Sequence, residues 1–184
     1  MAVLTLGLFL WIMGHLQRRL SPERRLAMGE TGRRVAALII GLGLLLMILG
    51  YLQAPYVPVY SPPPGAGHAN NGLMFVAVYL FGVGKSRGVL QAHLRHPMLS
   101  GVILWSVAHL LVNGDLASIV LFGALGLWAV AEIIAINRAG PWLRPAPGRI
   151  RGDLVNLVVA AVLYALIAWV HIWLGHDPFL GSYA

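Results

Sequence analysis

Residues 98–136 read MLSGVILWSVAHLLVNGDLASIVLFGALGLWAVAEIIAI, and this stretch decides the fold class. Two apolar runs flank a polar turn at residues 113–115. The charged residues of the whole stretch are Asp115 and Glu132. A membrane-spanning helix needs roughly 20 mostly apolar residues. The stretch therefore predicts two consecutive transmembrane helices, Met98–Asn113 and Leu116–Ile136, and we expect Asp115 to cap the second of them.

The composition agrees with a membrane protein. Of the 184 residues 59% are hydrophobic and 10% are charged, whereas a soluble domain carries about 25% charged residues. So few charges leave too little polar surface to solvate a globule, and a lipid bilayer solves this because lipid can face apolar side chains. The chain has no cysteine, which excludes disulfides, thiolate catalysis and cysteine metal sites.

Four further apolar segments bring the expected number of spans to about six. The fold class expected is an all-α, polytopic membrane helix bundle, formed by residues 1–184 as one transmembrane domain. The Pro- and Gly-rich segment 55–67 is expected to form no helix. The expected spans are Ala2–Gln17, Val35–Leu52, Gly72–Gly84, Met98–Asn113, Leu116–Ile136 and Leu154–Leu174.

The basic residues fix the expected orientation. All 13 Lys and Arg fall at residues 18–34, 85–95 and 138–151, which are alternate loops on one side of the bundle. The positive-inside rule places these loops in the cytoplasm and both termini outside. The net charge of +7 therefore belongs to the loops of a membrane protein. We expect the lipid bilayer as a partner and expect no binding of nucleic acid. Because Arg18 and Arg19 follow the first apolar segment, we expect that segment to be retained as a helix and not cleaved.

Polar residues in the spans form two stripes. Ser106, His109 and Asn113 share one face of their helix because they are spaced by three and four residues. On the last span a second stripe holds Asp153, Asn156, Ala160, Tyr164, Ala168 and His171. Such residues are costly in lipid, so they should point into the bundle. Small residues that would allow close helix packing are Gly7, Gly14, Gly43, Gly50, Ala161 and Ala165.

Three imidazoles lie within the expected spans: His15, His109 and His171. Histidine is a common haem ligand, and a helix bundle supplies the apolar pocket that haem needs. The alternative is that each imidazole is hydrogen-bonded to a neighbouring helix. His96 lies at the cytoplasmic interface one turn after His93, where a ligand role competes with a place in the first turn of a helix that begins at Pro97.

The stretch 95–118 gives the first resemblance to a known family. Arg95-His96-Pro97-Met98-Leu99-Ser100-Gly101, Leu104-Trp105-Ser106-Val107-Ala108-His109-Leu110-Leu111 and Asn113-Gly114-Asp115-Leu116-Ala117-Ser118 closely resemble the NnrU family. Gly14-His15 and His171-Ile172-Trp173-Leu174-Gly175 match as well. The resemblance covers nearly the whole chain and implies a bacterial inner-membrane protein associated with denitrification and nitric oxide metabolism.

The same segment is similar, more distantly, to 15-cis-zeta-carotene isomerase, a membrane haem enzyme. That resemblance implies His15 and His109 as haem ligands. The cysteine that serves the isomerase as an alternative ligand falls where this chain has Ser106.

Helix geometry gives each imidazole an expected depth. At 1.5 Å rise per residue, His109 lies about 16 Å from the cytoplasmic end of a helix that begins at Met98. His15 lies about 5 Å deep if Arg18 and Arg19 reach the interface. This difference in depth makes it difficult for one haem to bind both His15 and His109. An inner pair of His15 with His96 and an outer pair of His109 with His171 are therefore open alternatives.

The sequence thus predicts an inner-membrane protein that binds haem b through His15 and His109, with His96, His171 and Asn113 as alternative or supporting residues. It would act in nitrite or nitric oxide metabolism through redox sensing or electron transfer, with denitrification or respiratory components as partners. Two alternatives stay open: a redox-gated isomerase of a lipophilic polyene, and a non-catalytic assembly factor for denitrification enzymes. Whether the chain is an enzyme is open as well.

Overall fold

The computed structural model describes residues 1–179, and at Arg18, Leu20, Arg24 and Arg25 it describes the backbone alone. The side chains of Arg18, Arg24 and Arg25, which belong to the first predicted basic loop, lie outside the described residues. The described chain is all-helical, as predicted. Its elements are α1 (Ala2–Leu20), α2 (Pro22–Ala27), α3 (Gly29–Leu52), α4 (Ala66–Val83), the short 3-10 turn η1 (Leu90–Ala92), α5 (Pro97–Val112), α6 (Leu116–Ala139) and α7 (Ile150–Trp173).

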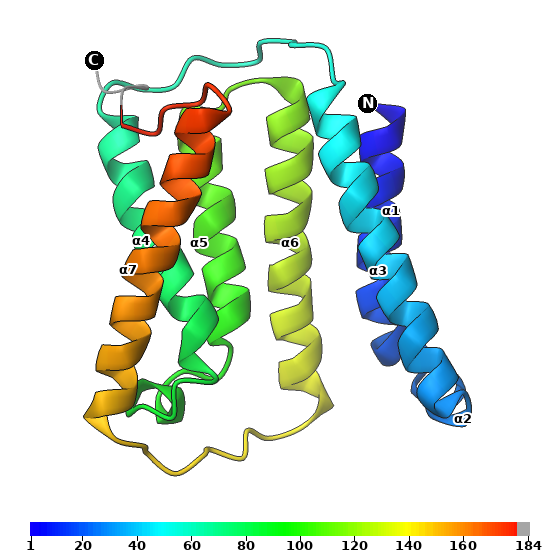
Figure 1. The fold of residues 1–184 in the computed structure, drawn as a ribbon. Helices are drawn as coiled ribbons and strands as arrows, with labels where there is room; N and C mark the ends of the chain where they lie inside the picture. The colour runs from blue at the N-terminus through cyan, green and yellow to red at the C-terminus, as the bar shows by residue number, and fades with distance from the viewer. Residues whose placement is uncertain (180–184) are drawn as a thin grey trace.

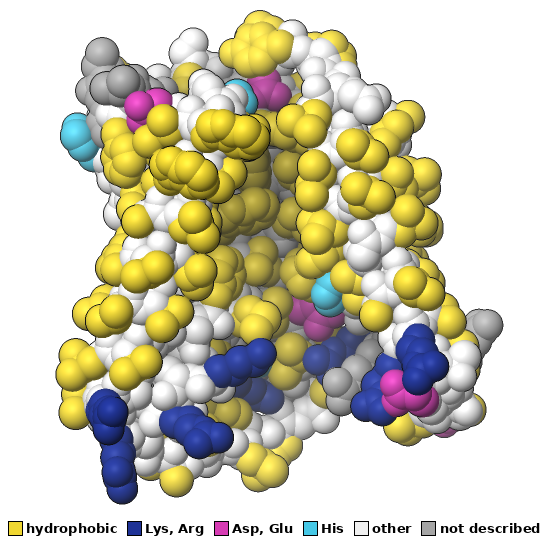
Figure 2. All heavy atoms as spheres, viewed as in Figure 1, with side chains coloured by type: hydrophobic (Ala, Val, Ile, Leu, Met, Phe, Trp, Pro, Cys, Tyr) yellow, Lys and Arg dark blue, Asp and Glu magenta, His cyan; other side chains and the backbone are white. Residues whose placement is uncertain are grey.

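The six long helices run alternately down and up, as Figure 1 shows. The N-terminus and the end of α7 therefore lie at one end of the bundle, and the α1–α3, α4–α5 and α6–α7 connections lie at the other. The described Lys and Arg gather at this second end, below a broad apolar surface (Figure 2). The predicted grouping of the basic loops is confirmed.

Three helices, α3, α6 and α7, are long and apolar enough to cross a membrane, and α1 and α5 are shorter apolar helices. At 24 residues each, the three long helices extend for about 36 Å, more than the ~30 Å hydrocarbon core. Large apolar side chains cover their outer faces, including Leu38, Leu127 and Trp173, which are more than 70% exposed. The chain is a membrane helix bundle.

The third span begins six residues earlier than predicted, at Ala66 instead of Gly72. Gly65 precedes it with a left-handed φ of 75°, a conformation that glycine adopts without a steric penalty. The Ala66 N–H donates to the Pro63 carbonyl at 3.1 Å, which closes the turn into the helix. The prediction that residues 55–67 contain no helix is therefore wrong for Ala66 and Gly67.

Glycines bring α1 and α3 into backbone contact. A Cβ added at Gly7 would lie 2.5 Å from the Met47 nitrogen, and one added at Gly43 would lie 2.7 Å from the Trp11 nitrogen. Gly50 is equally close to the backbone of Leu4. The predicted role of these glycines is confirmed, whereas Ala161 and Ala165, predicted to serve the same purpose, are exposed on α7.

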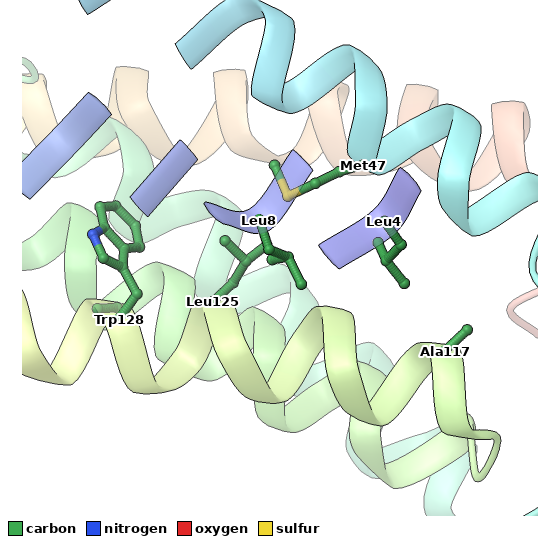
Figure 3. Close-up of a cluster of buried hydrophobic side chains, with 7 residues drawn as sticks. Leu4, Leu8, Met47, Ala117, Leu125 and Trp128 are labelled. Atoms are coloured by element: carbon green, nitrogen blue, oxygen red, sulfur yellow. The ribbon is translucent and has the colours of Figure 1, made fainter. Parts of the chain in front are cut away.

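The main apolar core lies where α6 meets the α1–α3 pair. Figure 3 shows Leu4 and Leu8 of α1 between Met47 of α3 and Leu125 of α6. Trp128 lies at one end of this cluster, on the left in Figure 3, and Ala117 at the other end, on the right. On its other side α6 packs against α5, and α5 against α4, so α6 joins the α1–α3 pair to the group α4, α5 and α7.

The segment after α3 holds the α5–α6 turn in place. The backbone N–H groups of Val59 and Tyr60 donate to the Gly114 carbonyl at 2.8 and 3.0 Å, and the Tyr60 hydroxyl donates to the Leu110 carbonyl. Burial and the Asp115 carboxylate raise the pKa of this hydroxyl, which keeps it a donor. Asp115 caps α6 by accepting from the Ser118 N–H at 3.0 Å, as predicted.

The polar stripe of α7 faces α4. Asp153, Asn156, Ala160 and Ala168 are buried. The Asn156 amide donates to the Tyr79 carbonyl at 3.0 Å, and the Tyr164 ring meets Phe75 edge-on. The predicted inward direction of the stripe is confirmed for these residues.

The glycine contact predicts a strong asymmetry between two neighbouring positions of α3. Gly43→Ala should lower the free energy of unfolding by about 2 kcal/mol, because the added methyl group forces the α1 and α3 backbones apart. Gly41→Ala, where no atom lies within 4 Å, should raise it by up to about 1 kcal/mol through helix propensity. Unfolding of each variant in detergent would measure both changes, and equal effects at the two positions would contradict the packing.

Candidate functional site

The predicted site residues lie along α6 at three different levels. Nearest the outer end, His109 contacts Phe122. Further toward the basic end, His15 contacts Trp128. At the basic end itself, the His96 ring nitrogen Nε2 lies 2.8 Å from the Asn137 oxygen. These contacts put each histidine in a different environment.

His109 lies among aromatic rings near the outer end of α5. Its imidazole stacks on Phe122 with 4.4 Å between ring centroids and 24° between planes. Trp105, one turn earlier, lies 5.0 Å away. The Nδ1 atom is 2.9 Å from the Trp105 carbonyl. Since a carbonyl only accepts, Nδ1 carries the proton, and Nε2 is left with its lone pair.

Asn113 and Ser106 support the helix around His109. The Asn113 amide donates to the His109 carbonyl at 2.9 Å and so closes the end of α5. The Ser106 hydroxyl is buried and donates to the Phe122 carbonyl at 2.8 Å. The Ser106 bond therefore holds α5 against α6, and the Asn113 bond stays within α5 and fixes the end of the helix that carries His109.

His15 has the same arrangement on α1. Its Nδ1 atom lies 2.9 Å from the Trp11 carbonyl, so Nε2 again keeps its lone pair. The ring lies 4.5 Å from the Trp11 ring and 4.8 Å from the Trp128 ring, and the two indoles meet edge-on at 5.9 Å. His15 is thus held between two tryptophans at the α1–α6 interface.

Buried polar atoms without a hydrogen-bond partner gather around His15. Among the described residues they include the indole nitrogens of Trp11 and Trp128 and the Oε1 atom of Glu132. The other Glu132 oxygen accepts from Arg19 Nε at 3.4 Å. An unpaired polar group costs about 1–3 kcal/mol when it is buried, and charged groups inside a membrane usually serve a function. This inner cluster therefore belongs to the candidate site.

His96 and Arg95 join α5 to the end of α6. His96 directly precedes Pro97, the first residue of α5, as predicted. Its ring is bonded to the Asn137 amide, and the Arg95 guanidinium donates to the Gly140 carbonyl at 2.7 Å. Arg95 thereby binds a carbonyl at the end of a helix, where positive charge is favourable. The contacts of both residues are those of a structural clamp.

His171 lies near the outer end of α7. Its Nδ1 atom is 2.8 Å from the Ile167 carbonyl, which repeats the pattern of His15 and His109. It interacts electrostatically with His109, and both imidazoles lie near the outer ends of their helices.

Within the pair favoured by resemblance, His15 and His109, the two rings contact α6 at different levels. The same is true of the inner pair, His15 and His96. The α6 partners of His109 and His15, Phe122 and Trp128, are six residues or about 9 Å apart along the axis. The partners of His15 and His96 are nine residues or about 13 Å apart. No ring contact joins His15 to His109 or to His96 within residues 1–179. The order of depth agrees with the sequence analysis.

The three imidazoles share one arrangement of their ring nitrogens. In each, a carbonyl fixes Nδ1 and leaves Nε2 as the possible ligand atom, which is also the arrangement found in metal-bound histidines. The aromatic walls exclude water, and the face between α7 and α3 is hollowed and lined with apolar side chains (Figure 2). No group of three or more His, Cys, Asp and Glu that could hold a bare metal ion occurs in the described part of the chain, and haem needs no such group.

The sequence analysis missed the inner cluster. Trp11 and His15 are four residues apart, as are Trp128 and Glu132, so each pair shares one helix face. That spacing was a usable signal within each helix. No local pattern indicates that the two faces meet, because Arg19 and Glu132 lie 113 residues apart.

Comparisons with known proteins give one result. A family model described as NnrU protein matches residues 3–178. No curated protein and no solved structure matches the chain.

The inner cluster predicts that Arg19 and Glu132 depend on each other. Arg19→Ala should lower the free energy of unfolding by about 2 kcal/mol, because it leaves the buried carboxylate without its donor. In a Glu132→Gln background the same change should cost much less. Arg33→Ala, which breaks an exposed pair with Glu30, should cost about 0.5 kcal/mol. If Arg19→Ala had the same cost in both backgrounds, the ion pair would have no energetic role.

Proposed function

The chain belongs to the NnrU family, and on that premise we propose that it is an inner-membrane haem b protein of denitrification and nitric oxide metabolism. We propose His109 as an axial ligand of the iron. His15, which the resemblance favours, and His171, the electrostatic neighbour of His109, compete for the second axial position. Bound haem would supply reversible one-electron chemistry or a site for a small gas.

One observation supports the proposal above the others. The three intramembrane imidazoles each bond through Nδ1 to the carbonyl four residues earlier. A histidine that merely joined two helices would direct a ring nitrogen at the neighbouring helix. Within the described chain, these three direct Nε2 at no protein acceptor or donor. They are oriented as ligands in advance, which lowers the cost of binding.

The surrounding residues have separate tasks. Trp105 and Phe122 hold the His109 ring at a fixed angle. Ser106 and Asn113 hold the helix that carries it. In the inner cluster, the buried indole N–H groups of Trp11 and Trp128 have no acceptor, and they flank the His15 ring.

Absorption spectra of protein expressed with ample haem test this proposal. His109→Ala should abolish the Soret band, whereas His93→Ala, a change at an exposed histidine of the α4–α5 connection, should leave it unchanged. If two histidines ligate the iron, loss of the second should convert a six-coordinate spectrum into a five-coordinate one. The variant that does so, His15→Ala or His171→Ala, identifies the second ligand.

A folded but colourless wild-type protein would refute haem binding and favour the assembly-factor alternative. Turnover of a cis-polyene under reducing conditions would favour the isomerase alternative. In that case the ligand variants would lose turnover and colour together.

We also propose the orientation that the basic loops indicate, with the α1–α3, α4–α5 and α6–α7 connections in the cytoplasm. Its test is simple because the chain has no cysteine. In intact cells a membrane-impermeant maleimide should label Ser61→Cys, in the connection after α3, and spare Ala146→Cys, in the α6–α7 connection. After lysis both should react, and the reverse pattern in intact cells would overturn the orientation.

A further inference from the structure

An open cleft of about 460 Å³ lies at the basic end of the bundle, away from the histidines. It is formed between the connection that follows α4 and the start of α7. Its polar lining consists of Ser86, Arg87, Gly148, Arg149, Arg151 and Gly152, and Val155 completes it. The proposed haem site uses none of these residues.

Backbone contacts fix the shape of this cleft. The N–H groups of Gly148 and Arg149 donate to the carbonyls of Gly88 and Arg87 at 3.0 and 3.1 Å. A Cβ at Gly148 would lie 1.8 Å from the Arg87 oxygen, so the two segments approach as closely as glycine allows. Behind them the buried Asp153 carboxylate accepts from the Val89 N–H at 2.7 Å. The cleft is therefore held rigidly and is not a gap between loose loops.

The three arginines of the cleft outnumber the buried Asp153 carboxylate behind it, so the cleft carries a net positive charge. Across residues 1–179, no salt bridge joins Arg87, Arg149 or Arg151 to a carboxylate. By contrast, Arg33 and Arg34 pair with Glu30 at the same end of the bundle. The cleft also lies at the start of α7, where the helix dipole adds partial positive charge. We therefore expect this positively charged cleft to bind an anion.

Arg87 adds an independent sign of function. Its φ of 52° is in the left-handed region, which costs a non-glycine residue of order 1 kcal/mol. Glycine would remove this strain, yet the chain has an arginine at this position in the lining of the cleft. Strained residues that persist in this way cluster at ligand-binding positions.

The cleft opens onto an apolar surface of α7. Val155 belongs to its lining and is 54% exposed, and Leu154, Val158 and Val162 continue along the helix with exposures of 55–64%. These side chains face the hydrocarbon region if α7 spans the membrane. A ligand that fits both parts has an anionic head for the arginines and an acyl chain for the helix.

We propose that this cleft binds the phosphate group of an anionic phospholipid of the cytoplasmic leaflet. Arginine side chains recognise phosphate oxygens through paired N–H donors. The proposal specifies one bound lipid whose chains lie along α7, which differs from general attraction of the basic end to a charged membrane.

The test measures retention of phosphatidylglycerol by the full-length protein in detergent, by native mass spectrometry, with phosphatidylcholine as the reference lipid. The wild type should retain one phosphatidylglycerol at least tenfold more tightly than phosphatidylcholine. Arg149→Ala/Arg151→Ala should lose this preference. Arg33→Ala/Arg34→Ala, which removes the same charge from the same end, should keep it.

Arg87→Gly keeps the test valid if the double variant folds poorly. Because glycine accepts a φ of 52°, this variant should be at least as stable as the wild type and yet lose most of the preference. Equal losses in the Arg33/Arg34 and Arg149/Arg151 variants would mean unspecific attraction and would refute the site. Displacement of the lipid by inorganic phosphate at equal concentration would identify a free anion as the ligand and refute the lipid.

Discussion

The constraint behind this structure is that lipid hydrocarbon offers no hydrogen bonds. Each polar group carried into the membrane must find its partner inside the protein. Most polar side chains of this bundle do so by bonding to backbone carbonyls, as Ser106, Asn113 and Asn156 show. Among the described residues, the few polar atoms that are left over lie in the inner cluster around His15 and at Asp153 near the start of α7, and they stand out for this reason.

α6 is the helix on which the candidate site depends. It contacts the α1–α3 pair on one side and α5 on the other, and its aromatic residues Phe122 and Trp128 receive the two histidines favoured by resemblance. These contacts lie at different depths, so the bundle holds imidazoles at two levels along α6.

Much of this architecture was predictable. The apolar runs and the alternate basic loops predicted the helices and their common basic end, and the Asp115 cap followed from local sequence. The start of α4 was missed because Gly65 and Pro63 close a turn that the Pro- and Gly-rich composition conceals. Ala161 and Ala165 were misassigned because small size alone does not indicate which face of a helix meets a neighbour.

The histidines of the candidate site could be selected from the sequence, but their contacts and the other members of the inner cluster could not. Helical spacing placed His109 and Asn113 on one face, and the structure adds that Asn113 bonds to the His109 carbonyl. The inner cluster joins α1 to α6, and no local pattern reports a contact across so long a stretch of chain.

The ion pair of Arg19 with Glu132 has a consequence for biosynthesis. The two residues are separated by 113 positions, and a ribosome adds about 5–20 residues per second. The α1–α3 pair, whose glycines already fit each other, can therefore assemble in the membrane roughly 6 to 23 s before Glu132 of α6 is synthesised. During that interval the inner cluster is open on the side that α6 later closes.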